Sequence, residues 1–474
     1  MSVKTKGSAF VTLIVIFFFW GFVAASNDIL IPVFKKALDL SQLQSQMISF
    51  AFYVAYTVGS ILYFSISALL KRDILNLIGY RNGLALGLVI SACGTLLFIP
   101  ASNNASFPLL ISGLFIVGLG FSLQQIAANP LAIQMGDPSK GNMRLSLAGG
   151  INNVGTTIGP VIVSFAIFGG ISNPDQALNL EAVQIPYLVL GATFIIAAVF
   201  FKLSSVPDRI GEVTENKGGQ IMETIKHPQV LLGMIAIFLY VGVEVSTASN
   251  LPEFMKQKLG TSESAVAPYV SLFWASLMIG RWTSAAGAFD LNESTKLKLS
   301  LLLPFAAFGV FAFANVIGGH SIQELYPYLL IVVVLAVADA VSEGQPARQL
   351  VLYSVLGSIA LMIGIFSSGM TSVFAFISVG LFCSTLWPCI FTLGIAGMGD
   401  KTNTASSLLI MMIMGGGVIS LTQGALSNDK VLGIQQSYWV GVVCFAYLAF
   451  FAIYVGRLLK QKGISFDQEA SGGH

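Results

Sequence analysis

Long apolar runs, separated by short polar stretches, fill almost the whole chain. About 20 apolar residues cross a bilayer as a helix, and only helices and closed barrels satisfy every backbone polar group in lipid. The runs are too long and too continuous for barrel strands, which alternate over about 10 residues. The pattern therefore predicts an all-α polytopic membrane protein with 14 spans. We expect these spans at about 9–35, 45–70, 82–100, 107–135, 145–170, 184–204, 229–256, 264–289, 297–318, 325–342, 349–368, 371–397, 404–426 and 436–459.

One long polar interruption divides the chain into two halves. It predicts an N-terminal six-helix bundle over 1–204, a cytoplasmic linker over 205–228, a C-terminal bundle over 229–462 and a polar tail over 463–474. The two halves contain similar motifs, since AASN precedes Pro32 and TASN precedes Pro252. Such similarity fits parallel repeats related by an axis along the membrane normal. The two extra spans, at about 297–342, then form an inserted helical hairpin.

Composition and charge support this organisation. The chain is 55% hydrophobic and 10% charged, with a mean hydropathy of +0.81, whereas soluble domains average about 25% charged residues. With both termini cytoplasmic, 19 of the 24 Lys and Arg residues fall in inner loops, as the positive-inside rule requires. No cleavable signal peptide is expected. The four cysteines lie in apolar spans without metal-ligand spacing, and we interpret them as small core residues.

Two acidic residues inside apolar spans are the first candidates for chemistry. Asp28 follows Asn27 within the first span, and Glu244 lies well inside the seventh. An acid at membrane depth costs about 2.5–3.5 kcal/mol on insertion scales and usually marks an ion or substrate path. We expect Asp28 and Glu244 to carry cation coupling; the alternative for Glu244 is a neutral, hydrogen-bonded structural acid. Asp339 lies one turn from the inner end of the hairpin, where it can reach the interface.

Amide side chains are the second group of candidates. An amide offers both donors and an acceptor, which suits a ligand with many hydroxyls. The same residues also form hydrogen bonds between membrane helices, so both interpretations stay open. One of Asn152 and Asn153 is expected to face the ligand, while Gly155 and Gly159 allow close helix approach. The expected substrate-binding residues are Asn27, Gln124, Gln125, Asn129, Asn152, Asn153, Asn250 and Trp387.

Proline and aromatic residues add local detail, and enzyme chemistry is not indicated. Pro130 is expected to bend its helix and free a carbonyl. Trp387 and Pro388 form a kinked aromatic site, which serves either sugar stacking or packing. The sequence contains no Ser/His/Asp set, Walker loop or metal cluster, so we expect no catalytic residue, no cofactor and no metal beyond a possible sodium ion at Asp28.

Six motifs taken together resemble one transporter family. They are NDILIP in the first span, QIAANP in the fourth, NNVGTTIGP in the fifth, YVGVEVS in the seventh, GR at the end of the eighth, and WPCIFTLGI. As a set they are similar to the fucose–galactose–glucose:proton symporter family of the major facilitator superfamily. The resemblance covers the chain apart from the hairpin and the tail.

The resemblance implies an alternating-access sugar symporter of the bacterial cytoplasmic (inner) membrane. It makes Asp28 a protonation site. Where the fucose permeases have a second acid, this chain has Gln125, which favours the glucose/galactose branch, in which some members use sodium. The resemblance thus leaves Na+ and H+ open as coupling ions, with Glu244 joining Asp28 at the cation site. We expect a hexose substrate, a lipid bilayer, no nucleic acid and a monomer. The alternatives are a facilitative sugar uniporter and a drug/proton antiporter.

Overall fold

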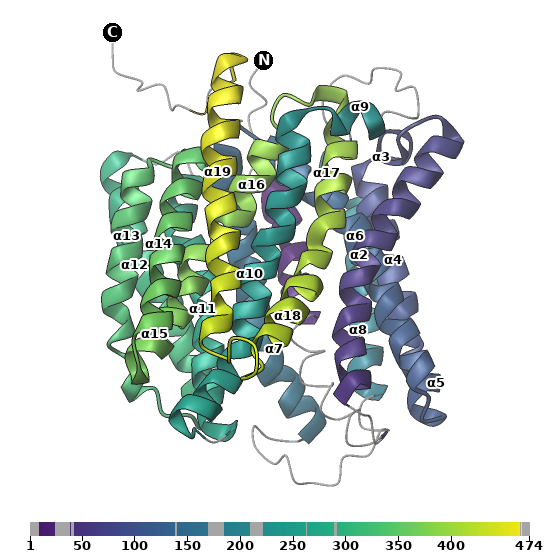
Figure 1. Ribbon diagram of the computed structural model, residues 1–474. Helices are drawn as coiled ribbons and strands as arrows, with labels where there is room; N and C mark the ends of the chain where they lie inside the picture. The colour runs from purple at the N-terminus through teal and green to yellow at the C-terminus, as the bar shows by residue number, and fades with distance from the viewer. Residues whose placement is uncertain are drawn as a thin grey trace.

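The computed structural model describes residues 9–23, 38, 42–137, 140–168, 184–208, 221–261, 263–288, 292–464 and 466. Within these residues the chain forms a bundle of long, roughly parallel helices (Figure 1). A first helix, Ala9–Val23, precedes the labelled ones. The long helices of the N-terminal half are α2 (Gln42–Leu70), α4 (Tyr80–Leu96), α6 (Phe107–Gln134), α7 (Gly141–Phe168) and α8 (Gln184–Leu203), with the short α3 (Ile74–Ile78) and α5 (Phe98–Asn103) at their ends.

The C-terminal half contains more helices, two of which are broken. A short linker helix, α9 (Ile221–Ile225), leads into it. Its helices are α10 (Pro228–Leu259), α11 (Glu263–Ala285), α12 (Glu293–Ile317), α13 (Tyr328–Ser342), α14 (Pro346–Phe366), α15 (Gly369–Cys383), α16 (Leu386–Ile395), α17 (Thr402–Met411), α18 (Gly415–Leu426) and α19 (Trp439–Gln461). A break at 384–385 separates α15 from α16, and a 3-10 turn, Met412–Met414, separates α17 from α18.

Eleven helices in the described part of the chain are long and apolar enough to cross a membrane. The 28-residue α7 and the 23-residue α11 lie in the same bundle but are more polar. The first helix, Ala9–Val23, is apolar and shorter over its described residues. The prediction of an all-helical membrane protein is confirmed. The count of 14 spans stays a prediction.

Helices in the described part of the chain pack mainly against others of the same half. The division into two bundles and a linker stays a prediction. In the N-terminal half, α4 packs against α6 and α8, and α2 against α6. In the C-terminal half, α10 packs against α18 and α19, and α14 against α15 and α19. The halves meet where α7 contacts α11 and where α17 contacts α2 and α6. The halves also meet outside these seams, where Asn403 at the start of α17 lies beside Asp73 and Tyr80, and where Asn142 donates to the Gly344 carbonyl.

The inserted hairpin lies at one edge of the C-terminal half, where Figure 1 shows α12 and α13 side by side. Three tyrosines and a glutamine form hydrogen bonds between the hairpin and its neighbours. Tyr269 of α11 donates to Glu324 Oε2 at 2.8 Å, and the hydroxyls of Tyr328 and Ser276 are 2.7 Å apart. Asp339 Oδ1 accepts from Gln349 Nε2 at 2.8 Å and from Tyr353 Oη at 3.4 Å. An acid in an apolar layer takes hydrogen bonds from the next helix.

Glycines set the closest helix contacts, as expected for Gly155 and Gly159. A Cβ at Gly155 would lie 2.3 Å from the Phe18 carbonyl oxygen, and one at Gly159 would lie 2.9 Å from that of Phe22. The backbones of α7 and the first helix therefore touch. Cys383, Cys389 and Cys444 are buried as expected, but Cys93 is exposed on the outer face of α4. The interpretation of Cys93 as a core residue is wrong.

Candidate functional site

Asn27 and Asp28 lie outside the described residues, so their expected roles are not tested by the structure. The first helix is described only to Val23. The site is therefore built from the amides of α6 and α7, the acid of α10, and the side chains that α11 and α16 place beside them.

The two neighbouring glutamines of α6 have different surroundings. Gln124 has no exposed surface; its Oε1 accepts from Trp20 Nε1 at 2.7 Å and its Nε2 donates to Ser91 Oγ at 3.1 Å. Gln125 is half-buried, and its Nε2 donates to Tyr56 Oη at 3.1 Å. Because a buried amide with both ends bonded has little left to offer a ligand, the geometry favours a structural role for Gln124. The described hydrogen bond of Gln125 uses Nε2, so its Oε1 can accept a hydrogen bond from a ligand.

Asn129 and Pro130 continue the same helix toward the α17 seam. The Asn129 side chain is 1% exposed, and its Nδ2 has no hydrogen-bond acceptor among the described residues. Pro130 lacks the N–H that would bond to the carbonyl of Ile126 four residues earlier. That carbonyl accepts from Ser406 Oγ of α17 at 3.1 Å instead. The expected proline-freed carbonyl thus joins the two halves.

The two asparagines of α7 point to different neighbours. Asn152 is half-buried and donates from Nδ2 to the Phe17 carbonyl oxygen at 2.8 Å. Asn153 is 3% exposed, and its Oδ1 accepts from Arg281 Nη1 at 2.8 Å. Of the pair, Asn152 is the more accessible, and Asn153 forms a contact between the halves.

Glu244 lies in the C-terminal half beside aromatic side chains. It is half-buried, and Tyr240 donates its hydroxyl to Glu244 Oε2 one helical turn away. The ring of Trp387 on α16 lies 6.2 Å from that of Tyr240 and stacks on Phe391 at 5.8 Å. Asn250 lies farther along α10, where its Nδ2 donates to the Ser246 carbonyl at 2.8 Å. The buried Tyr240 therefore connects Glu244 to the partly accessible Trp387 indole.

Arg281 is the functional candidate that sequence reasoning missed. The placement of Lys and Arg along the chain assigns Arg281 to an inner loop, but it lies within α11. Its Nε donates to the Ser384 carbonyl at 2.8 Å, and its Nη1 donates to the Gly149 carbonyl at 3.2 Å. Pro388 frees the Ser384 carbonyl as Pro130 frees that of Ile126. The sequence contains both Arg281 and Pro388, but only the fold shows that they lie together.

A polar cluster at the end of α2, α3 and α4 forms another contact between the halves. Asp73 accepts from Tyr63 Oη at 2.6 Å and from Asn403 Nδ2 of α17 at 3.0 Å. Tyr80 donates to Asn403 Oδ1. Asp73 also caps α3 by accepting from the backbone N–H of Asn76 at 2.9 Å. The Asp73 carboxylate therefore stabilises the start of α3 and also bonds to α17.

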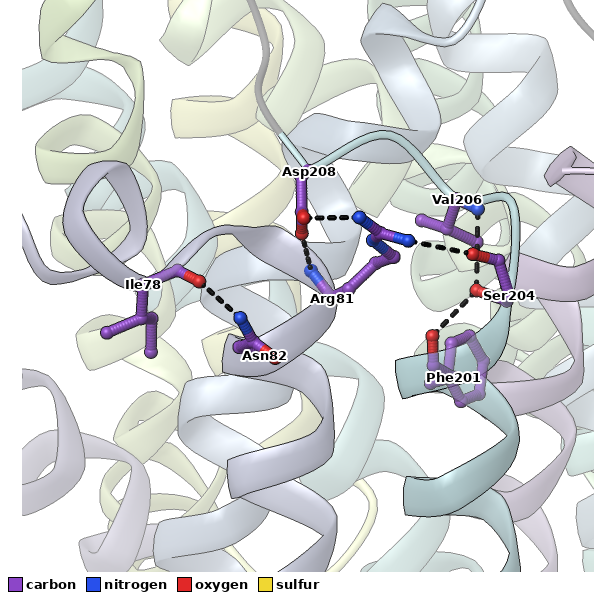
Figure 2. Close-up of polar contacts among 7 residues, drawn as sticks. All are labelled: Ile78, Arg81, Asn82, Phe201, Ser204, Val206 and Asp208. Atoms are coloured by element: carbon purple, nitrogen blue, oxygen red, sulfur yellow. Dashed lines mark hydrogen bonds and ion pairs between the residues drawn. The ribbon is translucent and has the colours of Figure 1, made fainter.

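An ion pair between Arg81 and Asp208 lies near the start of α4 (Figure 2). Arg81 Nη2 lies 2.5 Å from Asp208 Oδ2, and its Nη1 donates to the Ser204 carbonyl at 3.1 Å. Both groups are about one-third exposed, with side-chain accessibilities of 33% and 36%, so the pair itself adds little stability. Its effect is to fix the end of α8 against the start of α4, next to Tyr80.

The described residues contain no group of three or more His, Cys, Asp or Glu arranged to hold a metal ion. Glu244 of α10 and Arg281 of α11 are charged groups within long helices of the C-terminal half.

Comparison with known proteins supports the resemblance in the motifs. The family model of the Major Facilitator Superfamily matches residues 8–344. The glucose/galactose transporter of Brucella abortus is 30% identical, over 95% of each chain. The L-fucose-proton symporter of Escherichia coli is 25% identical, over 94% of this chain and 92% of that protein. These relatives are transporters, so the prediction of a transporter and not an enzyme is confirmed.

Solved structures show the same fold. The crystal structure of the transporter FucP in the outward conformation matches with a TM-score of 0.70 and 24% identity, over 94% of this chain and 98% of that chain. The helix order and the two halves are therefore shared with a known transporter architecture. The chain belongs to the major facilitator superfamily, with relatives named as glucose/galactose and fucose transporters.

Proposed function

We propose that the chain is a secondary active hexose symporter of the glucose/galactose type, driven by a sodium or proton gradient. The observation that carries this proposal is the hydrogen bond from Arg281 of α11 to Asn153 of α7, where the two halves touch, with the acid Glu244 on α10, which packs against α11. Polar groups that can bind hydroxyls thus lie on surfaces that must separate and close during transport, and an acid lies on the adjoining helix. The names of the relatives supply the class of substrate.

The proposed sugar site uses the polar side chains that remain partly accessible. Gln125 and Asn152 come from the N-terminal half and Trp387 from the C-terminal half. Amides bond to hydroxyls, and an indole packs on the apolar face of a sugar ring. Asn27, Asn129 and Asn250 remain further candidates, whereas Gln124 and Asn153 form the framework.

The proposed coupling site consists of Asp28 and Glu244. Binding of a proton or sodium ion removes a charge that opposes closure of an apolar seam. Sugar that bridges the two halves then favours the closed state, because a ligand shifts an equilibrium only through different affinities for the two states.

We further propose 14 spans with both termini cytoplasmic, in the cytoplasmic membrane of a bacterium. The Lys- and Arg-rich loops then face inward. The described hydrogen bonds of Asn403, Ser406 and Asn142 between the halves lie toward this inner end. The conformation is accordingly one closed to the cytoplasm.

The experiment is uptake of a panel of labelled hexoses into proteoliposomes, with sodium and proton gradients imposed separately. Wild type is compared with Asp28→Asn, Glu244→Gln and the exposed control Arg348→Gln. Accumulation that follows sodium at fixed pH assigns sodium, and accumulation that follows the proton gradient assigns protons. Each acid variant should keep sugar exchange and lose accumulation.

Two results would overturn the proposal. Equilibration of sugar that ignores both gradients would make the protein a facilitative uniporter. Failure to move any hexose, with export of lipophilic dyes in exchange for protons, would make it a drug/proton antiporter.

A further inference from the structure

The hairpin of α12 and α13 is flanked by two segments that both contact the other half of the chain. The turn Ala286–Ala288 precedes α12, and a Cβ at Gly287 in this turn would lie 2.3 Å from Sδ of Met143. Gly344 follows α13, and its carbonyl accepts from Asn142 Nδ2 at 3.1 Å. Asn142 and Met143 are consecutive residues in the first turn of α7. This turn therefore touches the chain both where it enters the hairpin and where it leaves it.

These contacts are buried. Asn142 has no exposed surface, and Met143 is 3% exposed. α12 itself also contacts α7, so the hairpin joins α11 and α16 among the elements of the C-terminal half on which α7 packs. A buried amide N–H that loses its acceptor is costly. Separation of the two segments therefore requires that water replaces the bond.

The chain reversal after α13 has a defined conformation. Glu343 and Gly344 have φ angles of 52° and 69°, in the left-handed region, which residues other than glycine adopt only when the surrounding structure holds them there. The bonds of Ser342 do this: its Oγ accepts from the Gly344 N–H at 3.4 Å, and its carbonyl accepts from the Gln345 N–H at 3.0 Å. The Gly344 carbonyl is thus presented to Asn142 by an ordered turn.

The hairpin is also fixed to the other helices of its own half. Asp339 Oδ1, near the end of α13, accepts from Gln349 Nε2 of α14 at 2.8 Å, and Gln349 Oε1 accepts from Cys389 Sγ of α16 at 3.3 Å. The hydroxyls of Tyr328 on α13 and Ser276 on α11 are 2.7 Å apart. Because these bonds join the hairpin to α11, α14 and α16, we expect it to move together with the C-terminal half.

We propose that the hairpin is a clamp that keeps the inner end of the transport path closed by binding the first turn of α7. In the closed conformation Asn142 bonds to Gly344, and Met143 packs on Gly287. Since the hairpin is fixed to the C-terminal half, rotation of one half against the other breaks both contacts. A hairpin at the edge of the bundle thereby stabilises the conformation closed to the cytoplasm. This inference rests on the proposed transport function and topology.

The test measures exposure of the contact between the halves and does not require transport. Ser146 lies one turn from Asn142 on the same face of α7; it is fully buried, and its hydroxyl has no partner among the described residues. A cysteine at position 146, in a background with Cys93 replaced, is reacted with a membrane-impermeant maleimide in the full chain in nanodiscs. Peptide mass spectrometry gives the rate at this position and separates it from the three buried native cysteines.

Asn142→Ala should raise the labelling rate about fivefold, the factor that corresponds to one lost hydrogen bond of about 1 kcal/mol. Asn142→Asp should raise it further, because its carboxylate cannot donate and repels the Gly344 carbonyl oxygen. Met143→Ala removes the second contact and should also raise the rate. The matched control is Asn315→Ala, at the other end of α12, where Asn315 Nδ2 donates to Ser271 Oγ at 3.0 Å within one half. It should lower the melting temperature and leave the labelling rate unchanged.

Unchanged labelling in the Asn142 and Met143 variants overturns the inference. Equal acceleration by Asn315→Ala also overturns it, because it indicates general loosening of the bundle. The labelling test and the uptake test can fail separately. Faster labelling of Asn142→Ala without hexose uptake by the wild type rejects the hexose substrate and keeps the clamp. Gradient-driven hexose uptake with unchanged labelling keeps the symporter and rejects the clamp.

Discussion

Ser406 of α17 donates a 3.1 Å hydrogen bond to the Ile126 carbonyl, which Pro130 deprives of its helical donor. The bond crosses from one half to the other inside a buried seam. Ser406→Ala should therefore weaken the closed inner end by about 1 kcal/mol, the usual worth of one such bond.

This prediction has a matched control in the next residue. Ser407 is equally buried, but its hydroxyl has no partner among the described residues. Ser407→Ala should therefore leave the equilibrium between closed and open inner ends unchanged. Both are measured by the distance between spin labels placed at the exposed Leu77 of α3 and Val341 of α13, in a background with Cys93 replaced. Equal effects of the two alanines would refute the role of the freed carbonyl.

Asn403 lies between Tyr80 and the carboxylate of Asp73. Asn403→Asp places a second carboxylate against Asp73 and should open the inner end, since like charges at this distance repel. A cysteine at position 406 should then react with a maleimide at least about tenfold faster, corresponding to about 1.4 kcal/mol. Asn82→Asp is the control, because Asn82 is exposed and donates to the Ile78 carbonyl at the end of α3, within the same half of the chain (Figure 2). Equal reaction rates in the two variants would contradict the prediction.

The two glutamines of α6 should separate stability from substrate binding. Gln124→Leu leaves the buried Trp20 indole N–H without its acceptor, at a cost of about 1–3 kcal/mol. It should lower the melting temperature and leave the KM of the remaining folded protein unchanged. Gln125→Ala should raise KM with little change in melting temperature. The reverse result would restore Gln124 as the sugar contact.

Gly155→Ala should destabilise the N-terminal half, because the new methyl would meet the Phe18 carbonyl oxygen at 2.3 Å. Overpacking of this kind costs about 1–3 kcal/mol. Gly309→Ala on α12 is the control: nothing lies within 4 Å of the added Cβ, and the change should stabilise the helix by about 0.4–1 kcal/mol. Thermal unfolding in detergent measures both, and a stable Gly155→Ala variant would rule out the tight contact.

His227, at the start of α10, gives a pH dependence. Burial, followed by the charges of Lys401 and Lys462, lowers its pKa below the ordinary value of 6.5. The unfolded chain therefore takes up this proton first as the pH falls, so the associated stability is present above pH 6.5 and declines below it. The melting temperature should fall between pH 7.5 and 5.5, and His227→Gln should reduce the slope. His320→Gln in the opposite loop is the control; no change in slope with His227→Gln would reject the assignment.

Hydrophobic length was enough to predict an all-helical membrane protein and the helices at about 297–342, whereas the division at the polar linker stays a prediction. These features follow from properties of single segments. The contacts of Asn153 with Arg281 and of Gln124 with Trp20 could not be predicted in this way, because each joins residues more than 100 positions apart. For the same reason the sequence predicted that Pro130 frees a carbonyl but could not identify Ser406 as the donor.

The contacts between the halves consist largely of hydroxyls, amides and backbone carbonyls. Ser406 with Ile126, Thr57 with the Met411 carbonyl, and Asn142 with the Gly344 carbonyl are all neutral pairs. Dissolved ions screen charges over about 8 Å at physiological ionic strength but do not compete for such bonds. Water does compete for them. Opening of the inner end should therefore respond to hydration and osmotic stress far more than to added salt.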